Sequence, residues 1–170
     1  MDVFECIRSR RSVRSFQDQP VDDEILRQVL DAARRAPSAN NRQNWKFVVV
    51  RDAKLRKELA AAAMDQTFVG EAPVVIVACA TKTDHVMPCG HPAHLVDVSI
   101  AIEHMALAAR ALGLGTCWIG AFRQEDVKRV LGIPKSVQVI DLLPIGYPAS
   151  WPPETSRKHL DEIVCYDRWQ

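Results

Sequence analysis

The sequence contains no long uninterrupted apolar run, and this absence excludes a membrane-spanning helix. None of its hydrophobic stretches reaches the roughly 18 residues that a helix needs to cross a bilayer. The N-terminal segment MDVFECIRSRRS contains an acidic residue and no apolar core, so it does not resemble a secretory signal. We therefore expect a cytoplasmic protein without a membrane partner.

A strong charge of either sign is also lacking. The 22 basic and 21 acidic side chains leave a net charge of +1, so the chain as a whole has no electrostatic bias toward nucleic acids. No aromatic residue interleaves with the arginines of segment 8–14. Because proteins that bind single strands combine basic groups with stacking aromatics, we expect no nucleic-acid partner.

The cysteines are too few and too irregularly spaced for a disulfide framework. There are five, an odd number: Cys6, Cys79, Cys89, Cys117 and Cys165. Disulfide scaffolds use even numbers of cysteines in oxidising compartments, so this usage fits a reducing cytosol. Cys79 and Cys117 fall in predicted strands and are expected to be inert core residues.

A glycine-rich dinucleotide fingerprint is absent as well, since no G-x-G-x-x-G motif occurs. This absence excludes the common strand–turn–helix site for a nicotinamide dinucleotide. It also leaves the sequence without a feature that would choose between NADH and NADPH.

The sequence does contain a regular succession of helical and extended segments. With 170 residues, 48% of them hydrophobic, it can bury one core, and we predict a single domain over residues 1–170. Periodicity and composition predict helices at 3–10, 22–36, 53–64, 93–112 and 124–131. Apolar runs predict strands at 47–50, 74–80, 116–119 and 137–147, with a strand-like piece at 163–166. This order predicts an α/β layered fold with helices on both faces of a sheet.

The predicted helix 93–112, which Gly113 and Gly115 end, is apolar on nearly all sides. One stripe consists of Leu95, Val98, Ile102, Met105, Ala109 and Leu112, and the opposite side carries Ile100, Ala101, Leu107 and Ala108. A helix of this kind is buried on several sides. We expect one side to face its own sheet and the other a second copy, giving a homodimer. The alternative is a central helix enclosed within one subunit.

A cluster of arginines follows the first predicted helix. Arg8, Arg10, Arg11, Ser12 and Arg14 lie within seven residues. Guanidinium groups pair bidentately with phosphate and a serine hydroxyl adds a neutral donor, so the cluster suits a phosphate monoester. A solvated basic surface is the alternative.

Two further segments carry groups that suit a flat heterocycle. Residues 37–45, PSANNRQNW, are dense in amides, which both donate and accept hydrogen bonds. Gly120 follows the predicted strand 116–119, where a glycine lets a flat ligand approach the backbone. Simple turns are the alternative for both segments. Prolines after Gly146 hold the tail extended, so that Arg157 and Lys158 can return to the arginine cluster.

Together and in this order, these segments resemble the nitroreductase family of FMN-dependent flavoproteins. The matching pieces are RRSVRSF (10–16), APSANNRQNW (36–45), APVVIVACA (72–80), VDVSIAIEHMALAARALGLGTCWIGAF (96–122) and PIGYP (144–148). The resemblance covers nearly the whole chain. It implies an α+β three-layer sandwich with a mainly antiparallel sheet, and a homodimer that holds FMN at its interface and exchanges its C-terminal segments.

The resemblance also implies roles for individual residues. Arg10 and Ser12, with Arg157 and Lys158 of the tail, are expected to hold the FMN phosphate. Arg11 is expected beside the ribityl chain and the phosphate.

The remaining implied contacts are with the flavin ring. Arg14 is expected near flavin N1 and O2, where a cation stabilises the anionic reduced ring. The second subunit is expected to contribute one loop, through Pro37, Ser38, Ala39, Asn41 and Gln43. Backbone N–H groups are expected near flavin N5 from Ile119, Gly120 and Ala121.

The function implied is that of an FMN-dependent oxidoreductase. Hydride from NAD(P)H would pass through flavin N5 to an electron-poor acceptor such as a nitroaromatic or a quinone. No side chain need act as acid or base, so no catalytic residue is predicted. Two alternatives remain: a flavin-binding or flavin-processing protein without NAD(P)H reductase activity, and an anion- or nucleic-acid-binding protein that uses the arginine cluster.

The segment TKTDHVMPCGHPAH (81–94) matches no substrate pattern. Cys89, His91, His94 and Asp97 are metal-ligand types at close spacing, which is one interpretation. A second is that His85, His91 or His94 lines a substrate pocket, and a third is a surface loop with a helix cap. We predict no metal.

Overall fold

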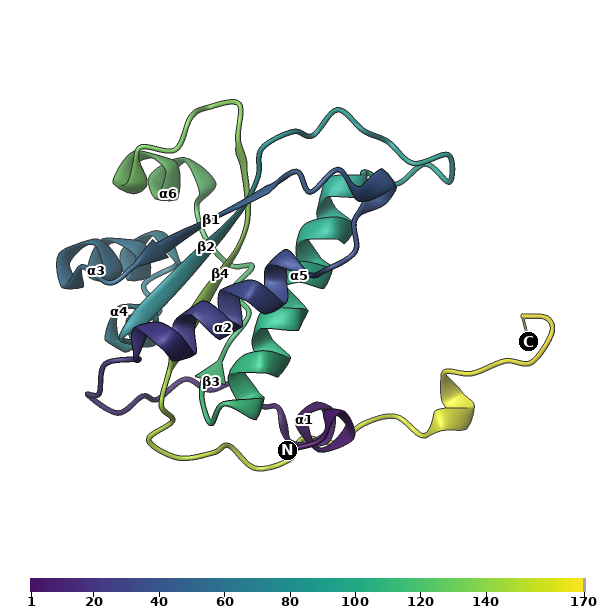
Figure 1. Cartoon of the computed structure of the whole chain (residues 1–170), viewed down its shortest axis with the longest axis horizontal. Coiled ribbons are helices and arrows are strands. Elements are labelled where there is room, and N and C mark those ends of the chain that lie inside the picture. Colours follow the sequence, from purple (N-terminus) through teal and green to yellow (C-terminus); the bar gives the residue numbers. More distant parts are fainter. Residues whose placement is uncertain (170) are drawn as a thin grey trace.

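A four-stranded sheet forms the centre of the computed structural model, which describes residues 1–169 (Figure 1). Its strands are β1 (Trp45–Val50), β2 (Val74–Ala80), β3 (Gly115–Thr116) and β4 (Gln138–Gly146), in the spatial order β1-β2-β4-β3. The three pairings between these strands are all antiparallel. The antiparallel sheet that the resemblance implied is confirmed.

Helices cover both faces of this sheet (Figure 1). One face carries α2 (Asp23–Arg34) and α5 (Ala93–Ala111), and the other carries α3 (Ala53–Ala62), α4 (Thr67–Glu71) and α6 (Gln124–Leu131). The short helix α1 (Val3–Ser9) packs against α5. The fold is therefore an α+β sandwich of three layers, as predicted.

Strand β2 belongs to both hydrophobic cores because every one of its residues is buried. Ile76 and Ala78 pack in the core under α2 and α5, while Val75 and Val77 pack in the core on the other face. Successive side chains of a strand point to opposite faces, so a continuous apolar run fits a strand covered on both sides. The predicted bounds, 74–80, are confirmed.

Helix α5 is fully enclosed on only one side. Val98, Ile102 and Met105 have no exposed surface and pack in the core with α2 and the sheet. Leu95 and Val96, near the start of the helix, are 41% and 42% exposed. Apolar surface thus remains open on the helix that we predicted to face a second copy. In residues 1–169, no helix has the combined length and apolar character of a membrane span.

Three short segments differ from the prediction, whereas the other element bounds agree within two residues. The strand predicted at 116–119 is only the two-residue β3, followed by an isolated bridge between Ile119 and Leu142. Helix α4 was not predicted, because five residues are too few to display a helical period.

The strand-like piece predicted at 163–166 is wrong. The tail there follows a single 3-10 turn, η2 (Leu160–Glu162), and has no strand beside it. Figure 1 shows the tail extending away from the body of the subunit. A strand needs a neighbouring strand to pair with, whereas residues 163–166 adopt turn, coil and bend conformations.

Candidate functional site

The arginine-rich segment runs beside β3, where backbone hydrogen bonds hold it. The N–H of Val13 donates to the carbonyl of Thr116 (2.9 Å), and Ser12 forms a parallel bridge with the same residue. Val13 is fully buried, whereas Arg14 is exposed. Because neighbouring residues of an extended segment point to opposite sides, burying Val13 directs Ser12 and Arg14 away from the core.

This close approach requires a glycine in β3. A Cβ atom at Gly115 would lie 2.5 Å from Cγ2 and 2.7 Å from Cβ of Val13, closer than real side chains allow. The sequence analysis treated Gly115 as part of the helix stop. The structure gives that role to Gly113, whose φ of +81° lies in the left-handed region. Gly115 instead makes room for the arginine segment.

A pocket of about 230 Å³ gathers the arginines and the start of the tail. Its lining comprises Arg10, Arg11, Ser12, Arg14, Pro152, Pro153, Thr155 and Arg157. None of these lining residues is acidic, so the pocket concentrates positive charge and hydroxyl donors around one space. The structure therefore brings Arg157 to the arginine cluster, while Lys158 is exposed and does not line the pocket.

The arginines of this pocket differ in how far they are already engaged. Arg10 Nε lies 3.7 Å from Glu103 of α5, and Arg11 Nη2 lies 3.6 Å from Glu154. Arg11 also donates from Nη1 to the carbonyls of Arg8 (2.6 Å) and Arg10 (2.9 Å). Within residues 1–169, Arg14 has no hydrogen bond or ion pair with another residue. Its guanidinium is available to a ligand.

The segment after β3 lies against the arginine segment. Burial raises the pKa of the Cys117 thiol, and nearby Arg14 and Ser12 oppose that rise, so the three residues are neighbours. A raised pKa keeps this thiol protonated and unreactive, as expected for a core cysteine. A Cβ added at Gly120 would meet no atom within 4 Å, so open space adjoins this backbone. The next residue, Ala121, accepts a hydrogen bond at its carbonyl from Gln66 Nε2 (3.3 Å).

A buried carboxylate under this segment was missed by the sequence analysis. Asp141 of β4 is 2% exposed, and its Oδ2 has no hydrogen-bond partner. Burial raises the pKa of Asp141 to about 8, although the backbone N–H groups of Ile119 and Leu142 oppose the rise. The carboxyl is therefore largely protonated at neutral pH. A single aspartate inside a strand gives no sequence pattern that would have revealed it.

The amide-rich loop lies at the first turns of α5. It forms a one-turn 3-10 helix, η1 (Ala39–Asn41), in which the N–H of Ala39 donates to Asp97 Oδ1 (3.0 Å). The N–H of Gln43 donates to Ser38 Oγ (3.0 Å), which closes the loop. Pro37, Ser38, Ala39, Asn41 and Gln43 thus come together, and their side chains are at least partly exposed.

Helix α1, which leads into the arginine segment, and the loop before β1 lie at opposite ends of α5 (Figure 1). The loop is tied to Asp97, whereas α1 is tied to the other end, where Arg110 Nε donates to Ser9 Oγ (2.9 Å). Asp97 and Arg110 are 13 positions apart, so their backbones are separated by about 20 Å along the helix axis. One subunit therefore does not bring these two predicted parts of the site together.

The segment 81–94 forms a surface loop leading into α5. Cys89 and His91 are exposed, while His94 is 8% exposed and pairs through Nε2 with Gln138 Oε1 (2.8 Å). In the described part of the chain, no three His, Cys, Asp or Glu side chains are grouped to hold a metal ion. The segment is thus a surface loop that runs into α5, but the helix cap of the third interpretation is not seen, since Pro92 precedes the helix without a side-chain cap.

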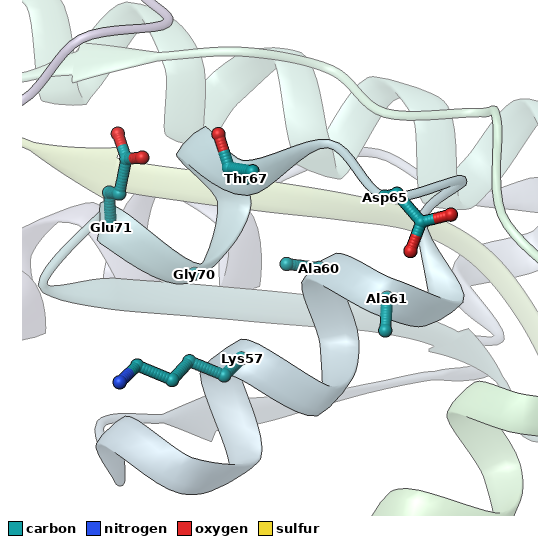
Figure 2. A pocket seen from close by; sticks show the side chains of 7 residues that line it. All are labelled: Lys57, Ala60, Ala61, Asp65, Thr67, Gly70 and Glu71. Atoms are coloured by element: carbon teal, nitrogen blue, oxygen red, sulfur yellow. The ribbon is translucent and has the colours of Figure 1, made fainter.

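A second pocket, of about 440 Å³, lies between α3 and α4 (Figure 2). Its floor is formed by Ala60, Ala61 and Gly70, with Lys57 and Glu71 at its rim. A Cβ at Gly70 would lie 3.3 Å from Ala60 Cβ, so this glycine allows the two helices to pack closely. None of the predicted site residues lines this pocket.

Comparisons with known proteins agree with the fold and the motifs. The sequence model described as the nitroreductase family matches residues 7–70 and 62–147. An NADH dehydrogenase of Thermus thermophilus is 32% identical over an alignment of 197 positions, gaps included. The alignment covers 98% of this chain and 96% of that protein. An FMN reductase (NAD(P)H) of Bacillus subtilis is 32% identical over 165 residues, covering 87% of this chain and 66% of that protein.

Solved structures share the same architecture. The crystal structure of a nitroreductase family protein from Clostridium difficile superposes with a TM-score of 0.90 at 31% identity. The match covers 99% of this chain and 100% of that one, so the two share their length as well as their fold.

Proposed function

The chain belongs to the nitroreductase family, and on this premise we propose that it is an NAD(P)H-dependent FMN oxidoreductase acting on electron-poor acceptors such as nitroaromatics or quinones. The observation that carries the proposal is the arginine–serine pocket, and the open space beside Gly120 supports it. The names of the two relatives, an FMN reductase and an NADH dehydrogenase, support the choice of cofactor and donor. When bound, FMN supplies hydride transfer at N5.

The lining of the arginine pocket fits the phosphate end of FMN. Arg10 and Arg157 supply guanidinium groups, which can pair bidentately with phosphate. Ser12 supplies a hydroxyl, which can donate one hydrogen bond to it. Arg11 is held by the carbonyls of Arg8 and Arg10, so it lines the pocket in a fixed position and would contact the ribityl chain when FMN is bound. Lys158, at the exposed edge, adds positive charge to the approach.

The segment after β3 fits the ring end of the same cofactor. Gly120 has open space beside its backbone, which a larger residue would fill, and Ala121 follows it. The N–H of Ile119 already donates to the carbonyl of Leu142 (3.0 Å), so of the three predicted backbone donors Ile119 is not free to reach a ring. The guanidinium of Arg14 lies next to this segment, where its positive charge would stabilise negative charge on a reduced flavin ring. These residues bind and polarise; none of them needs to donate or accept a proton.

A second copy of the chain completes the proposed site. Its loop would supply Pro37, Ser38, Ala39, Asn41 and Gln43, because the loop of the same subunit lies at the far end of α5. Exposed apolar residues on α1 support such an interface: Phe4 is 68% and Ile7 54% exposed. We propose a homodimer with one FMN site at each end of the interface.

The C-terminal tail fits an exchange between the two subunits. Leu160, Ile163, Tyr166 and Trp169 are all more than 60% exposed on a tail that leaves its own subunit (Figure 1). Apolar side chains concentrated on one such segment normally mark a surface that a partner covers. In the proposed dimer, each tail lies across the other subunit.

An absorption spectrum of the purified protein, before and after anaerobic NADH or NADPH, tests the function. Flavin bands that bleach on addition of the nucleotide are the expected result. Flavin bands that persist would favour a flavin-binding protein without NAD(P)H reductase activity. A protein that takes up no FMN on reconstitution would contradict the proposal altogether.

A further inference from the structure

One buried carboxylate ties the amide loop to the body of the protein. Asp97 lies in α5, is 5% exposed, and accepts the hydrogen bond of the Ala39 N–H (3.0 Å). In residues 1–169, no other hydrogen bond joins residues 37–43 to a residue outside that loop. Apart from the chain connections to α2 and β1, this bond is therefore the one polar contact between described residues that holds the loop against α5.

The loop has three non-glycine residues in the left-handed region, which asparagine tolerates better than glutamine does. Asn40, Asn41 and Gln43 have φ angles of 52°, 52° and 51°. The bonds from Gln43 to Ser38 Oγ and Asn41 Oδ1 close the loop on itself. They do not place it against α5. A strained loop of this kind persists where its surroundings hold it.

We infer that Asp97 is a positioning residue for the cofactor, holding the amide loop in the shape in which it meets the flavin of the partner subunit. The inference rests on the proposed function, since it takes the loop as part of a flavin site. Asp97 acts through Ala39 and does not itself touch the ligand. A buried donor that loses its acceptor is left unsatisfied at a cost in free energy, so this hydrogen bond can hold the turn against a rigid helix.

Helix α5 thereby fixes both halves of the proposed site. Near its start Asp97 holds the loop, and farther along Glu103 pairs with Arg10 of the phosphate pocket. The helix itself is anchored by the fully buried Val98, Ile102 and Met105. A change at Asp97 should therefore alter the loop without moving the arginine pocket.

Two substitutions at this position separate the hydrogen bond from the rest of the side chain. Asp97→Ala removes the acceptor, whereas Asp97→Asn keeps an acceptor oxygen of the same size. We expect Asp97→Ala to speed amide hydrogen exchange in residues 38–43 and to weaken FMN binding about tenfold or more, and Asp97→Asn to stay within about threefold of the wild type. Hydrogen exchange of the full-length apoprotein and FMN fluorescence titration measure the two effects. Asp52→Ala, which removes the carboxylate cap of α3 from the Leu55 N–H (2.9 Å), is the matched control and should change neither.

The donor side of the same bond gives an independent test that leaves Asp97 in place. Proline at position 39 has no N–H, and the preceding Ser38 is extended (φ −145°, ψ 156°), a conformation compatible with a following proline. We expect Ala39→Pro to reproduce the effect of Asp97→Ala. The double variant should bind FMN no more weakly than either single variant, because both remove one interaction.

The outcomes separate this inference from the proposed function. Unchanged loop exchange in both Asp97→Ala and Ala39→Pro would overturn the role of Asp97 even if the wild type binds FMN. Faster loop exchange with unaltered FMN affinity would show that the loop is tethered but does not meet the cofactor, which also overturns it. A wild-type protein that binds no FMN would overturn the proposed function, while hydrogen exchange would still decide whether Asp97 holds the loop.

Discussion

Arg14 differs from Arg10 and Arg11 because its guanidinium is not already engaged. Arg10 pairs with Glu103 and Arg11 with Glu154, whereas Arg14 has no such partner in residues 1–169. Its charge nevertheless reaches Cys117, next to the segment that leads to Gly120. An unpaired cation in this position is suited to stabilising negative charge on a bound ring.

Replacing Arg14 with alanine is expected to make bound flavin harder to reduce. Loss of one charged hydrogen bond, about 1.5–3 kcal/mol, corresponds to a midpoint potential lower by about 30–60 mV for a two-electron couple. Anaerobic spectroelectrochemistry measures this shift. Arg14→Lys keeps the charge and should retain a large part of the potential. A wild-type potential and turnover in Arg14→Ala would contradict the role given to this residue.

Asp141 should make stability depend on pH. In the unfolded chain its carboxyl ionises near its ordinary pKa of 3.8, whereas burial raises the pKa in the fold to about 8. Between these values the folded state keeps a proton that the unfolded state has lost. The free energy of unfolding therefore falls as pH rises, by about 1.4 kcal/mol per pH unit from this group.

The variant Asp141→Asn lacks this titration. Its stability relative to the wild type should increase from pH 5 to pH 8 and level off above. Urea denaturation at pH 5, 6.5 and 8 measures the difference. Parallel pH profiles of the two proteins would show that the carboxyl is not protonated in the fold.

At the scale of single residues, the sequence predicts groups that occur in patterns and misses groups that act alone. The arginines and Ser12 were recognisable because several donors stand within a few positions. Asp97 stood out only as a possible metal ligand beside His91 and His94, and Asp141 is a single carboxylate in an apolar segment. Only their burial in the fold distinguishes the two from surface acids.

Among the elements, those defined by their own sequence were predicted well. Strand β2 is buried on both faces along its whole length, and α6 ends at Gly132 in the left-handed region. Their signals are local. Strand β3 was predicted too long, because its length depends on partners far away in the sequence: β4 on one side and the segment around Val13 on the other.

The pairing between β3 and the arginine segment gives a prediction for Gly115. Its Cβ would clash with Val13, so Gly115→Ala should destabilise the protein by about 1–3 kcal/mol and displace the arginine segment. Thermal and urea unfolding of the apoprotein measure the loss. Gly120→Ala is the matched control, because its Cβ meets nothing within 4 Å and the apoprotein should keep its stability. Equal stability of the two variants would argue against the proposed packing.

For the whole molecule, the order of motifs along the chain does not reveal which of them share a subunit. The arginine cluster and the amide loop were both recognised as parts of one site. Only the fold shows that α5 separates them within a subunit, since Asp97 and Arg110 anchor them to different ends.

The tail should contribute to assembly rather than to the fold of its own subunit. A chain that ends at residue 159 lacks the exposed apolar side chains of Leu160, Ile163, Tyr166 and Trp169. We expect this truncation to raise the dimer dissociation constant at least about tenfold. The far-UV circular dichroism spectrum, which reports helix and sheet content, should stay nearly unchanged. Sedimentation velocity over a concentration series measures the change. A wild-type chain that sediments as a monomer at micromolar concentration would refute the dimer.

The separation of the two parts of the site along α5 has a genetic consequence. In a dimer in which each site takes its arginines from one subunit and its loop from the other, two alleles with different defects can complement each other. A subunit carrying Arg14→Ala paired with one carrying Asp97→Ala forms one site with both defects and one site with neither. Equal co-expression should restore about a quarter of the wild-type number of sites, although each variant alone has none intact. If each subunit held a whole site of its own, every site in the mixture would carry one of the two defects. Co-expression of the two variants would then restore no intact sites.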